Sequence, residues 1–325
     1  GSAGHVMPHL ALIPEMKRKD WSLFYIGTSA IEKDLVKPFN LPFYTITTGK
    51  LRRYFSFQNF LDIFRCGLSL LQSFFYLLLL RPHVVFSKGG YVSVPVCVAA
   101  WLLRIPIITH ESDLTPGLAN KIIMKFASRV LYSFAQTQKH LPKSSVQVTL
   151  PVRKDLLQGS QAKALKFCGF MSHDKRPTLL VMGGSLGSVS LNSVIVEALD
   201  ELLKKYRVIH LTGKNKKVLY AKEGSYFQAE FAKKELSDFL ALADLVVSRS
   251  GANSLFEYLA LAKPMVLVPL VKGSRGDQVD NARCFEANGW AKVLNESTVT
   301  AKELIRTVDD VFADRVMKKR LEKKK

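Results

Sequence analysis

Short apolar runs alternate with helix-like patterns along almost the whole chain, and this alternation limits the folds open to it. The runs form two series: 22–27, 83–88, 106–111 and 129–134, and then 178–184, 207–213, 244–251, 264–270 and 291–296. Strands that alternate with helices are typical of a parallel sheet covered by helices on both faces. The sequence therefore predicts an α/β protein with two doubly wound, Rossmann-like parallel-sheet domains in tandem.

The stretch between the two series differs in composition. With 325 residues, 48% of them hydrophobic, the chain can form two cores. Residues 152–177 contain the charged, Gly- and Ser-bearing segment "RKDLLQGSQAKALK". We predict a first domain at 1–151, a linker at 152–177, a second domain at 178–311 and a final helix at 312–325.

Charge and cysteine content narrow the partners and the compartment. The net charge is +20, and residues 1–150 and 151–325 each hold half of it. Such an excess suits nucleic acid, an anionic membrane or phosphorylated small molecules, although a protein that is merely basic remains an alternative. No nucleic-acid-binding motif is present, which argues against nucleic acid. The four cysteines lack zinc-site spacing, so we expect a reduced intracellular protein without a metal site.

One predicted helix, at 59–80, is apolar nearly all round. Its charge-free part, 66–80, is shorter than the roughly 20 residues that cross a bilayer, so a transmembrane span is disfavoured. A buried crossover helix is one interpretation. The other is a helix whose apolar face enters the membrane surface while nearby basic residues meet lipid phosphates. These residues are Lys50, Arg52, Arg53, Arg65 and Arg81.

A glycine loop opens the second domain. In "TLLVMGGSLGSVSLN" a strand ends at Gly183-Gly184-Ser185, and a helix is expected from about Leu186. Backbone N–H groups at such a helix start can hold an anion. The spacing is not G-x-G-x-x-G, and no acid follows the next strand, so a dinucleotide site is excluded. A diphosphate site remains, beside the alternative that the glycines only allow a tight turn.

Two further helix starts in this domain carry polar groups. In "SRSGANSLFEYL", Glu257 lies six residues past Gly251, where its carboxylate could accept two hydrogen bonds from a ribose diol. The alternative is a solvated helix acid. In "GDQVDNA", Asp277 and Gln278 fall in a first helical turn and could bind sugar hydroxyls, although both are common there.

The first domain shows comparable turns. The chain opens with "GSAGHVMPHL", a glycine-containing loop bearing His5, and later has "SKGGYVSVP" and "HESDLTPGLANK". Open α/β sheets bind ligands at the carboxyl ends of their strands, where these turns fall. Two such sheets facing each other would form one deep cleft.

These motifs, together with "LPVR", "GGSLGS", "SRSGA…E" and "DQVDNA", occur in the order and spacing of the MurG family of bacterial peptidoglycan N-acetylglucosaminyltransferases, in glycosyltransferase family 28. The resemblance covers essentially the whole chain. It implies a GT-B fold that transfers N-acetylglucosamine from UDP-GlcNAc to the C4 hydroxyl of lipid I, a polyprenyl-pyrophosphate-linked muramyl pentapeptide. The product is lipid II, made on the cytoplasmic face of the membrane by a peripheral enzyme. The family also has a strand before the first glycine loop, and its C-terminal helix packs back on the first domain.

The resemblance also implies site residues. Glu257 would bind the ribose, the Ser185 loop the donor phosphates, and Gln278 the transferred sugar. The donor set is Ser2, Ala3, Gly4, Asp113, Arg153, Gly184, Ser185, Leu186, Ala252, Glu257, Asp277 and Gln278, and the acceptor set is Gly4, His5, Gly89, Gly90, Tyr91 and Asn120.

The implied reaction is inverting, so a base must take the proton of the acceptor hydroxyl. His5 is the best base by residue type, with phosphate binding or a structural role as alternatives, and Glu111 is a second candidate. No Asp-x-Asp motif follows a strand, so we expect neither a metal nor another cofactor. Rival functions are another UDP-sugar enzyme of this fold, such as an epimerase or a glycolipid synthase, and a non-catalytic sugar-nucleotide-binding protein.

Overall fold

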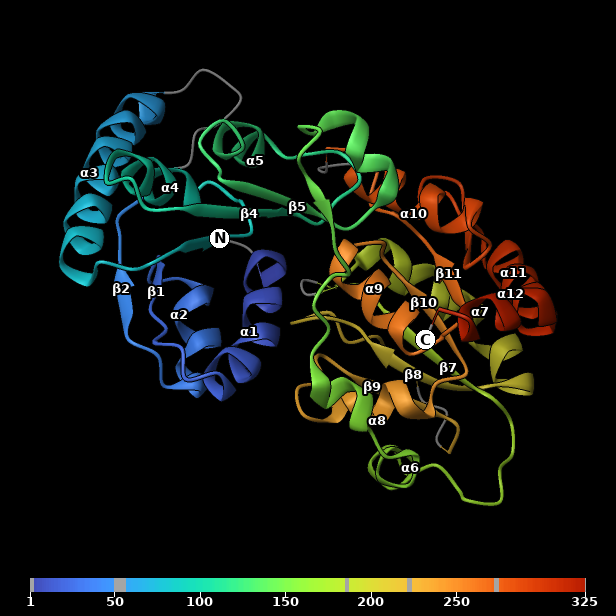
Figure 1. The fold of residues 1–325 in the computed structure, drawn as a ribbon. Coiled ribbons are helices and arrows are strands. Elements are labelled where there is room, and N and C mark those ends of the chain that lie inside the picture. Colours follow the sequence, from blue (N-terminus) through green and yellow to red (C-terminus); the bar gives the residue numbers. More distant parts are fainter. Residues whose placement is uncertain (1–2, 50–56, 185–186, 221–223, 272–274, 325) are drawn as a thin grey trace. The chain divides into compact units, whose positions relative to one another are not determined.

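The computed structural model describes residues 3–49, 57–184, 187–220, 224–271 and 275–324 (Figure 1). The chain forms two compact units, Gly1–Pro151 and Val152–Lys325. All the strand pairs in both units are parallel, as the alternation of strands and helices predicts. The α/β prediction is confirmed.

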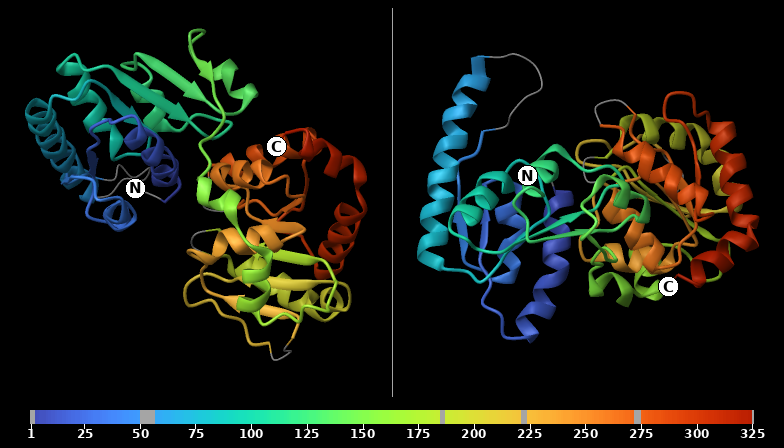
Figure 2. Two further views of the ribbon diagram at one scale, coloured as in Figure 1. Left: turned by 60° about the horizontal axis from the view of Figure 1, so that its bottom comes forward. Right: turned by 45° about the horizontal axis from the view of Figure 1, so that its top comes forward.

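The strands of the first unit pair in two groups, β1-β2 and β3-β4-β5-β6. Helices connect most of them, and α3 and α4 lie side by side in the views of Figures 1 and 2. The strands are β1 (Tyr25–Gly27), β2 (Phe43–Thr45), β3 (Val85–Ser87), β4 (Ile107–Glu111), β5 (Arg129–Tyr132) and β6 (Val146–Gln147). The helices are α1 (Ala3–Arg18), α2 (Ile31–Val36), α3 (Phe57–Leu80), α4 (Ser93–Leu102) and α5 (Leu118–Ile123), with 3-10 turns η1 (Lys37–Phe39) and η2 (Ala135–His140).

The expected glycine loop at the start of the chain is helical from Ala3, which corrects that prediction. Val6, Leu10 and Ile13 follow helical spacing, are at most 5% exposed, and pack with Val36 in one cluster. Burial of this stripe extends the helix into the glycine-bearing segment. His5 therefore lies in the first turn of α1.

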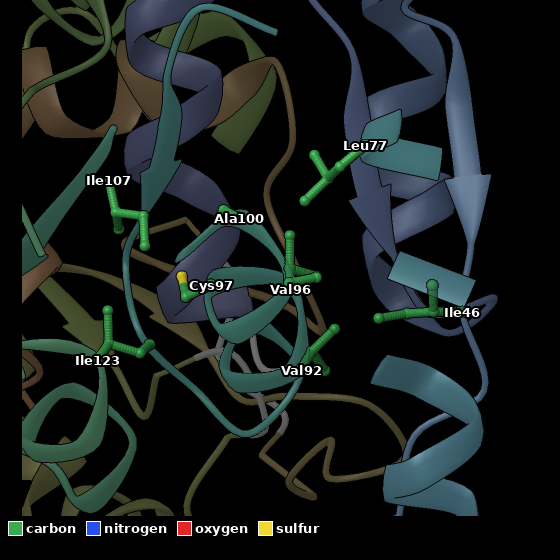
Figure 3. Packing of buried hydrophobic residues seen from close by; sticks show 9 residues of the cluster. Ile46, Leu77, Val92, Val96, Cys97, Ala100, Ile107 and Ile123 are labelled. Carbon is green, nitrogen blue, oxygen red and sulfur yellow. The ribbon is translucent and has the colours of Figure 1, made fainter. Parts of the chain in front are cut away.

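Helix α4 is the centre of the main core of this unit. Figure 3 shows its residues Val96, Cys97 and Ala100, with Val92 just before it, lying between Leu77 and Ile46 on one side and Ile107 and Ile123 on the other. The exposed fractions of all eight side chains are 7% or less. This packing fixes the start of α4, and with it the Gly89–Gly90 turn that follows β3.

The second unit has one six-stranded sheet in the order β12-β11-β10-β7-β8-β9. In chain order this is 3-2-1-4-5-6, the doubly wound order whose direction reverses between β7 and β10. The strands are β7 (Thr178–Met182), β8 (Arg207–Leu211), β9 (Tyr226–Ala229), β10 (Leu245–Ser248), β11 (Met265–Leu267) and β12 (Ala291–Val293). The helices are α6 (Gln161–Cys168), α7 (Val189–Lys205), α8 (Glu235–Leu242), α9 (Ala252–Ala260), α10 (Asp277–Ala287), α11 (Ala301–Ala313) and α12 (Arg315–Glu322), with the 3-10 turn η3 (Lys154–Gln158).

The segment 152–177, which composition marks as a linker, contains η3 and α6, and both pack on α8. The Ser160 backbone N–H donates to Asp238 Oδ1 at 2.7 Å. At Gly159 a Cβ atom would stand 1.9 Å from Ser237 O, so only glycine allows the chain to lie this close to α8. These contacts fasten the segment to the second unit.

Candidate active site

The glycine loop of the second unit lies at the reversal of strand order, where doubly wound sheets bind nucleotides. Gly183 follows β7 directly, and its Cβ would meet Ser188 N at 2.5 Å. At Gly187, with φ +67°, a Cβ would meet Thr212 O at 2.3 Å. Ser188 caps α7, accepting a hydrogen bond from Leu191 N at 3.2 Å. Steric need and phosphate binding thus both favour glycine here.

Arg249 holds the end of this loop in place through Ser188 and Ser190. No motif in the sequence indicates it. It follows β10, its side chain is 8% exposed, and it forms an ion pair with Glu296. Its guanidinium donates to Val268 O at 2.8 Å, Ser188 Oγ at 2.5 Å and Ser190 Oγ at 3.2 Å. Burial alone would raise the pKa of Glu296, but hydrogen bonds from Arg249 and Ser190 outweigh it and lower that pKa. The network joins the start of α7 to the ends of β10 and β11.

Glu257 lies on α9, and Arg153 belongs to the same unit. Burial raises the pKa of Glu257 to about 7, although the positive charge of Arg153 acts in the opposite direction. The side chain of Arg153 is 22% exposed and pairs with Asp155 at 3.6 Å. The Nε of Arg153 is buried and has no partner among the described residues. A carboxyl group poised near neutral pH and an unsatisfied guanidinium donor are typical of a binding site.

The start of α10 is tied to the same edge of the sheet. Ser250 Oγ donates to Gln278 O at 2.7 Å, and Asn281 Nδ2 donates to Ser250 O at 3.3 Å. The side-chain oxygen of Gln278 accepts from Leu270 N at 3.1 Å. Asp277 Oδ1 accepts from Arg275 N at 3.1 Å. Through Ser250, which lies just before α9, these hydrogen bonds join the starts of α9 and α10. Ala252, the first residue of α9, is buried.

In the first unit, His5 and the Gly89–Gly90 turn come together. Both glycines have positive φ, +79° and +84°. The ring of His5 covers Gly90, where a Cβ would lie 3.5 Å from three of its carbon atoms. Ser93 Oγ donates to Gly90 O at 2.8 Å and so joins the turn to α4. Tyr91, next in the chain, is 37% exposed. This arrangement places an imidazole beside backbone that a ligand can approach closely.

The side chain of Asn120 packs directly against Gly89, so replacing this glycine should destabilise the fold. A Cβ at Gly89 would lie 2.6 Å from Asn120 Oδ1, in a backbone conformation that L-residues avoid. We expect Gly89→Ala to lower the free energy of unfolding by about 1–3 kcal/mol, measured by urea denaturation with circular dichroism. The control is Gly67→Ala in α3, where no atom lies within 4 Å and alanine favours the helix. Equal midpoints for the two variants would contradict this.

Glu111 and Asn120 are engaged inside the first unit. Both are at most 4% exposed. Glu111 Oε1 accepts from Asp113 N at 2.9 Å, and Oε2 accepts from Gly117 N at 3.0 Å and Asn120 Nδ2 at 2.8 Å. Asn120 Oδ1 accepts from Thr109 Oγ1 at 3.0 Å. Both side chains therefore hold the 112–118 loop against β4 and α5.

Lys88, just before the Gly89–Gly90 turn, and His110 on β4 form a buried pair that the sequence did not indicate. Lys88 is 2% exposed, and its Nζ lies 2.9 Å from His110 Nδ1. Burial lowers the pKa of His110 to about 2 and that of Lys88 to about 8. His110 is therefore neutral; it accepts from Lys88 and donates from Nε2 to Ser133 Oγ at 2.9 Å. A lysine before two glycines gives no local signal of burial.

Ser2, Ser185 and Leu186 of the predicted site lie outside the described residues, as do Lys50, Arg52 and Arg53 of the predicted basic group. Ala3 begins α1, followed by Gly4 in its first turn. Within the described ranges, no His, Cys, Asp and Glu side chains gather in a group of three or more that could hold a metal ion. The four cysteines are free.

A doubly wound sheet with a glycine loop at its switch point is the arrangement of a nucleotide-binding α/β protein. Two family descriptions match the chain: Glycosyltransferase family 28 N-terminal domain over residues 1–132 and Glycosyltransferase family 28 C-terminal domain over residues 178–325. The chain therefore belongs to glycosyltransferase family 28, and its two parallel-sheet units are those of the GT-B fold.

Individual relatives agree with this assignment. The chain is 48% identical, over its whole length and 93% of the relative, to a UDP-N-acetylglucosamine--N-acetylmuramyl-(pentapeptide) pyrophosphoryl-undecaprenol N-acetylglucosamine transferase 2 of Bacillus cereus. It is 46% identical, over 96% of the chain and 87% of the relative, to the UDP-N-acetylglucosamine--N-acetylmuramyl-(pentapeptide) pyrophosphoryl-undecaprenol N-acetylglucosamine transferase of Legionella pneumophila. The crystal structure of Acinetobacter baumannii MurG superposes with a TM-score of 0.77 at 25% identity, covering 99% of this chain and 91% of that one.

Proposed function

We propose that this chain transfers N-acetylglucosamine from UDP-GlcNAc to lipid I, an undecaprenyl-pyrophosphoryl-muramyl pentapeptide, to give lipid II. The observation that carries the proposal is the near-half identity, over the whole chain, to transferases described by that reaction. The placement of the glycine loop, Glu257 and Arg153 in one doubly wound unit supports it. An epimerase or a glycolipid synthase has no comparable support at this level of identity.

In this proposal the second unit holds the donor. The N-terminus of α7 and the backbone of the glycine loop receive the diphosphate and stabilise the negative charge that grows as UDP leaves. Glu257 in its ionised form accepts hydrogen bonds from the two ribose hydroxyls, and the unsatisfied Nε of Arg153 lies near the nucleotide. The other donor residues of this unit, Ala252, Asp277 and Gln278, lie at the starts of α9 and α10.

The first unit holds the acceptor. The Gly89–Gly90 turn and Tyr91 present backbone and an exposed aromatic ring to the pyrophosphate and its sugar. His5, whose ring covers Gly90, takes the proton of the C4 hydroxyl as that oxygen attacks the anomeric carbon from the face opposite UDP. Because both oxygens of Glu111 already accept hydrogen bonds, we assign Glu111 and Asn120 to positioning the loop that carries Asp113.

Helix α3 supports binding to an anionic membrane surface. Its inner face packs on α4, while Phe64, Leu68, Leu71, Phe75, Leu78 and Leu79 are 47–69% exposed. Their spacing places them on one stripe of the helix. No described helix meets the length and hydropathy that spanning a bilayer demands. We propose that this stripe inserts into the cytoplasmic face of the membrane, with Arg65 and Arg81 near the lipid phosphates.

This membrane role gives a direct prediction. Leu71→Glu and Phe75→Glu should each weaken partitioning onto phosphatidylglycerol vesicles by roughly tenfold, because each removes a large apolar side chain from the lipid contact. Vesicle co-sedimentation measures this. Val316→Glu on α12, at a side chain that is 59% exposed in the second unit, is the control and should leave partitioning unchanged. If all three variants sediment like the parent protein, α3 is not the contact.

The function itself is tested with radiolabelled UDP-GlcNAc and a soluble analogue of lipid I, with and without EDTA. We expect transfer of label to the acceptor in both conditions, since the proposed chemistry uses no metal. UDP binding without turnover would favour a non-catalytic sugar-nucleotide-binding protein. Transfer to diacylglycerol, or conversion of the donor alone, would favour the rival enzymes.

A further inference from the structure

A chain of hydrogen bonds leads from β9 through β8 to α7, beside the glycine loop of the second unit. The hydroxyl of Tyr226 on β9 lies 3.1 Å from Nδ1 of His210 on β8, and Nε2 of His210 lies 3.0 Å from Oδ1 of Asn192 on α7. Asn192 Nδ2 donates to Thr212 O at 3.0 Å and to Lys216 O at 3.3 Å. His210 and Asn192 are at most 4% exposed. The hydrogen bonds therefore tie α7 to the turn that follows β8.

The direction of each hydrogen bond follows from the donors and acceptors available. Because Nδ2 of Asn192 donates to two carbonyl groups, its Oδ1 is the acceptor that faces His210, and Nε2 of His210 carries the proton. Nδ1 of His210 then accepts from the hydroxyl of Tyr226. Burial lowers the pKa of His210 to about 4, so the ring is neutral at pH 7. Tyr226 thus sets the tautomer of His210, and His210 sets the orientation of the Asn192 amide.

The turn that Asn192 holds packs directly on the glycine loop. At Gly187 a Cβ atom would lie 2.3 Å from Thr212 O and 2.6 Å from Gly213 Cα, so the two backbone segments are in close contact. Lys216 Nζ also donates to Gly187 O at 3.2 Å. The carbonyl group of Thr212 therefore accepts from Asn192 and packs against Gly187 at once. A shift of the Asn192 amide would displace the backbone that supports the loop.

The core around α7 does not require a polar residue at position 192. The other six buried residues of α7, which the structure describes throughout, are apolar: Leu191, Ile195, Ala198, Leu199, Leu202 and Leu203. Asparagine is a weak helix former, and an apolar side chain would be buried without the cost of desolvating an amide. What the polar chain adds is a fixed orientation of the groups that it joins.

We propose that Asn192 and His210 are positioning residues for the donor diphosphate, because they hold the 212–216 turn against Gly187 and so fix the loop that binds the phosphates. This inference rests on the proposed transferase function, which assigns the loop to UDP-GlcNAc. Arg249 holds the start of α7 from the side of β10, and the Asn192 chain holds Gly187 from the side of β8. Such support matters, since a misplacement of about 1 Å can cost about 100-fold in rate.

The binding of UDP and of uridine to the full chain, compared side by side, tests this role, because only UDP carries the phosphates. Asn192→Ala should weaken UDP binding about tenfold or more, the worth of one hydrogen bond to a charged group, and leave uridine binding unchanged. Calorimetry measures the affinity for UDP, and ligand-observed NMR measures that for uridine. In steady-state kinetics, Asn192→Ala should raise the donor KM and leave the acceptor KM at the parental value.

A matched pair of tyrosine variants separates positioning from a general loss of stability. Tyr226→Phe leaves Nδ1 of His210 without its donor and should weaken UDP binding about fivefold, the worth of one neutral hydrogen bond. Tyr206→Phe is the control: Tyr206 lies just before β8, at the opposite end of the strand from the turn, and its hydroxyl donates to Asp309 Oδ1 at 2.7 Å. It should bind UDP with parental affinity, while urea denaturation records the stability of both variants.

Variants of His210 give a rescue test. His210→Leu should resemble Asn192→Ala, whereas His210→Gln, whose amide nitrogen can donate to Asn192 Oδ1, should recover most of the UDP affinity. If the variants of Asn192, His210 and Tyr226 keep the parental ratio of UDP affinity to uridine affinity, the positioning role is wrong and the transferase function stands. Equal loss of UDP affinity in Tyr206→Phe and Tyr226→Phe would also overturn it. A parent protein that binds no UDP would refute the proposed function itself.

Discussion

His5→Gln is expected to lower turnover at least 100-fold while the affinity for UDP-GlcNAc changes little. General bases contribute about 100-fold to 10,000-fold, and glutamine keeps the polarity and size of the side chain without its basicity. His5 belongs to the first unit, whereas the proposed diphosphate and ribose contacts belong to the second, so donor binding is predicted to be largely spared. Steady-state kinetics at saturating donor and acceptor, with donor affinity from calorimetry, separate the two effects.

His140→Gln is the matched control, since His140 is exposed at the end of η2 in the same unit. It should have parental kinetics. If His5→Gln retains more than about a tenth of the turnover, and instead raises the acceptor KM, His5 binds the acceptor phosphate and another group takes the proton. Glu111→Gln, expected to act through the 112–118 loop, would then be compared for its pH profile.

Glu257→Ala is expected to weaken UDP-GlcNAc binding by at least about 10-fold to 150-fold, the range of one hydrogen bond to a charged group. The fold should survive, because burial disfavours the charged form of Glu257 and its removal leaves no unpaired charge behind. Glu197→Ala, at an exposed site on α7, is the control. Calorimetry with UDP-GlcNAc measures both, and parental affinity in Glu257→Ala would refute the ribose assignment.

The raised pKa of Glu257 adds a pH dependence with a defined sign. With a pKa of about 7 the carboxyl group is mostly protonated at pH 6 and mostly ionised at pH 8. Only the ionised group can accept both ribose hydrogen bonds, so donor affinity should rise by roughly tenfold across that interval. In Glu257→Gln this dependence should disappear. A parental affinity that is flat or falls with pH would contradict the assignment.

The central strands were predictable because they are buried on both faces. Runs such as 178–184, 207–213 and 264–270 are rich in Val, Ile and Leu, as is typical of buried strands in a parallel sheet. Strands β2, β6 and β9 were missed because they are two to four residues long and only partly buried or exposed, so their apolar pattern is weaker than that of the central strands. The start of α1 was misjudged because the glycine at position 4 outweighed the apolar stripe that begins at Val6.

Local motifs in the sequence indicated the glycine turns of the candidate site. They did not indicate the buried charged and polar side chains that pack against these turns. Turn residues at strand ends carry their own signal, since positive φ and close backbone approach both demand glycine. Arg249 and Glu296 are 47 residues apart in the sequence. Lys88 lies just after β3, and it contacts His110 on the neighbouring strand β4. Such pairs follow from the strand order, which one sequence without tertiary information does not specify.

The buried pair of Arg249 and Glu296 has a consequence for engineering new sugar-nucleotide preferences into this scaffold. Altering one partner alone would leave the other charge without its partner in a site with little solvent contact, which destabilises the fold. The pair would therefore have to be exchanged together, with Ser188 and Ser190 adjusted to match. Replacements elsewhere in the second unit that leave both partners in place would keep this anchor intact.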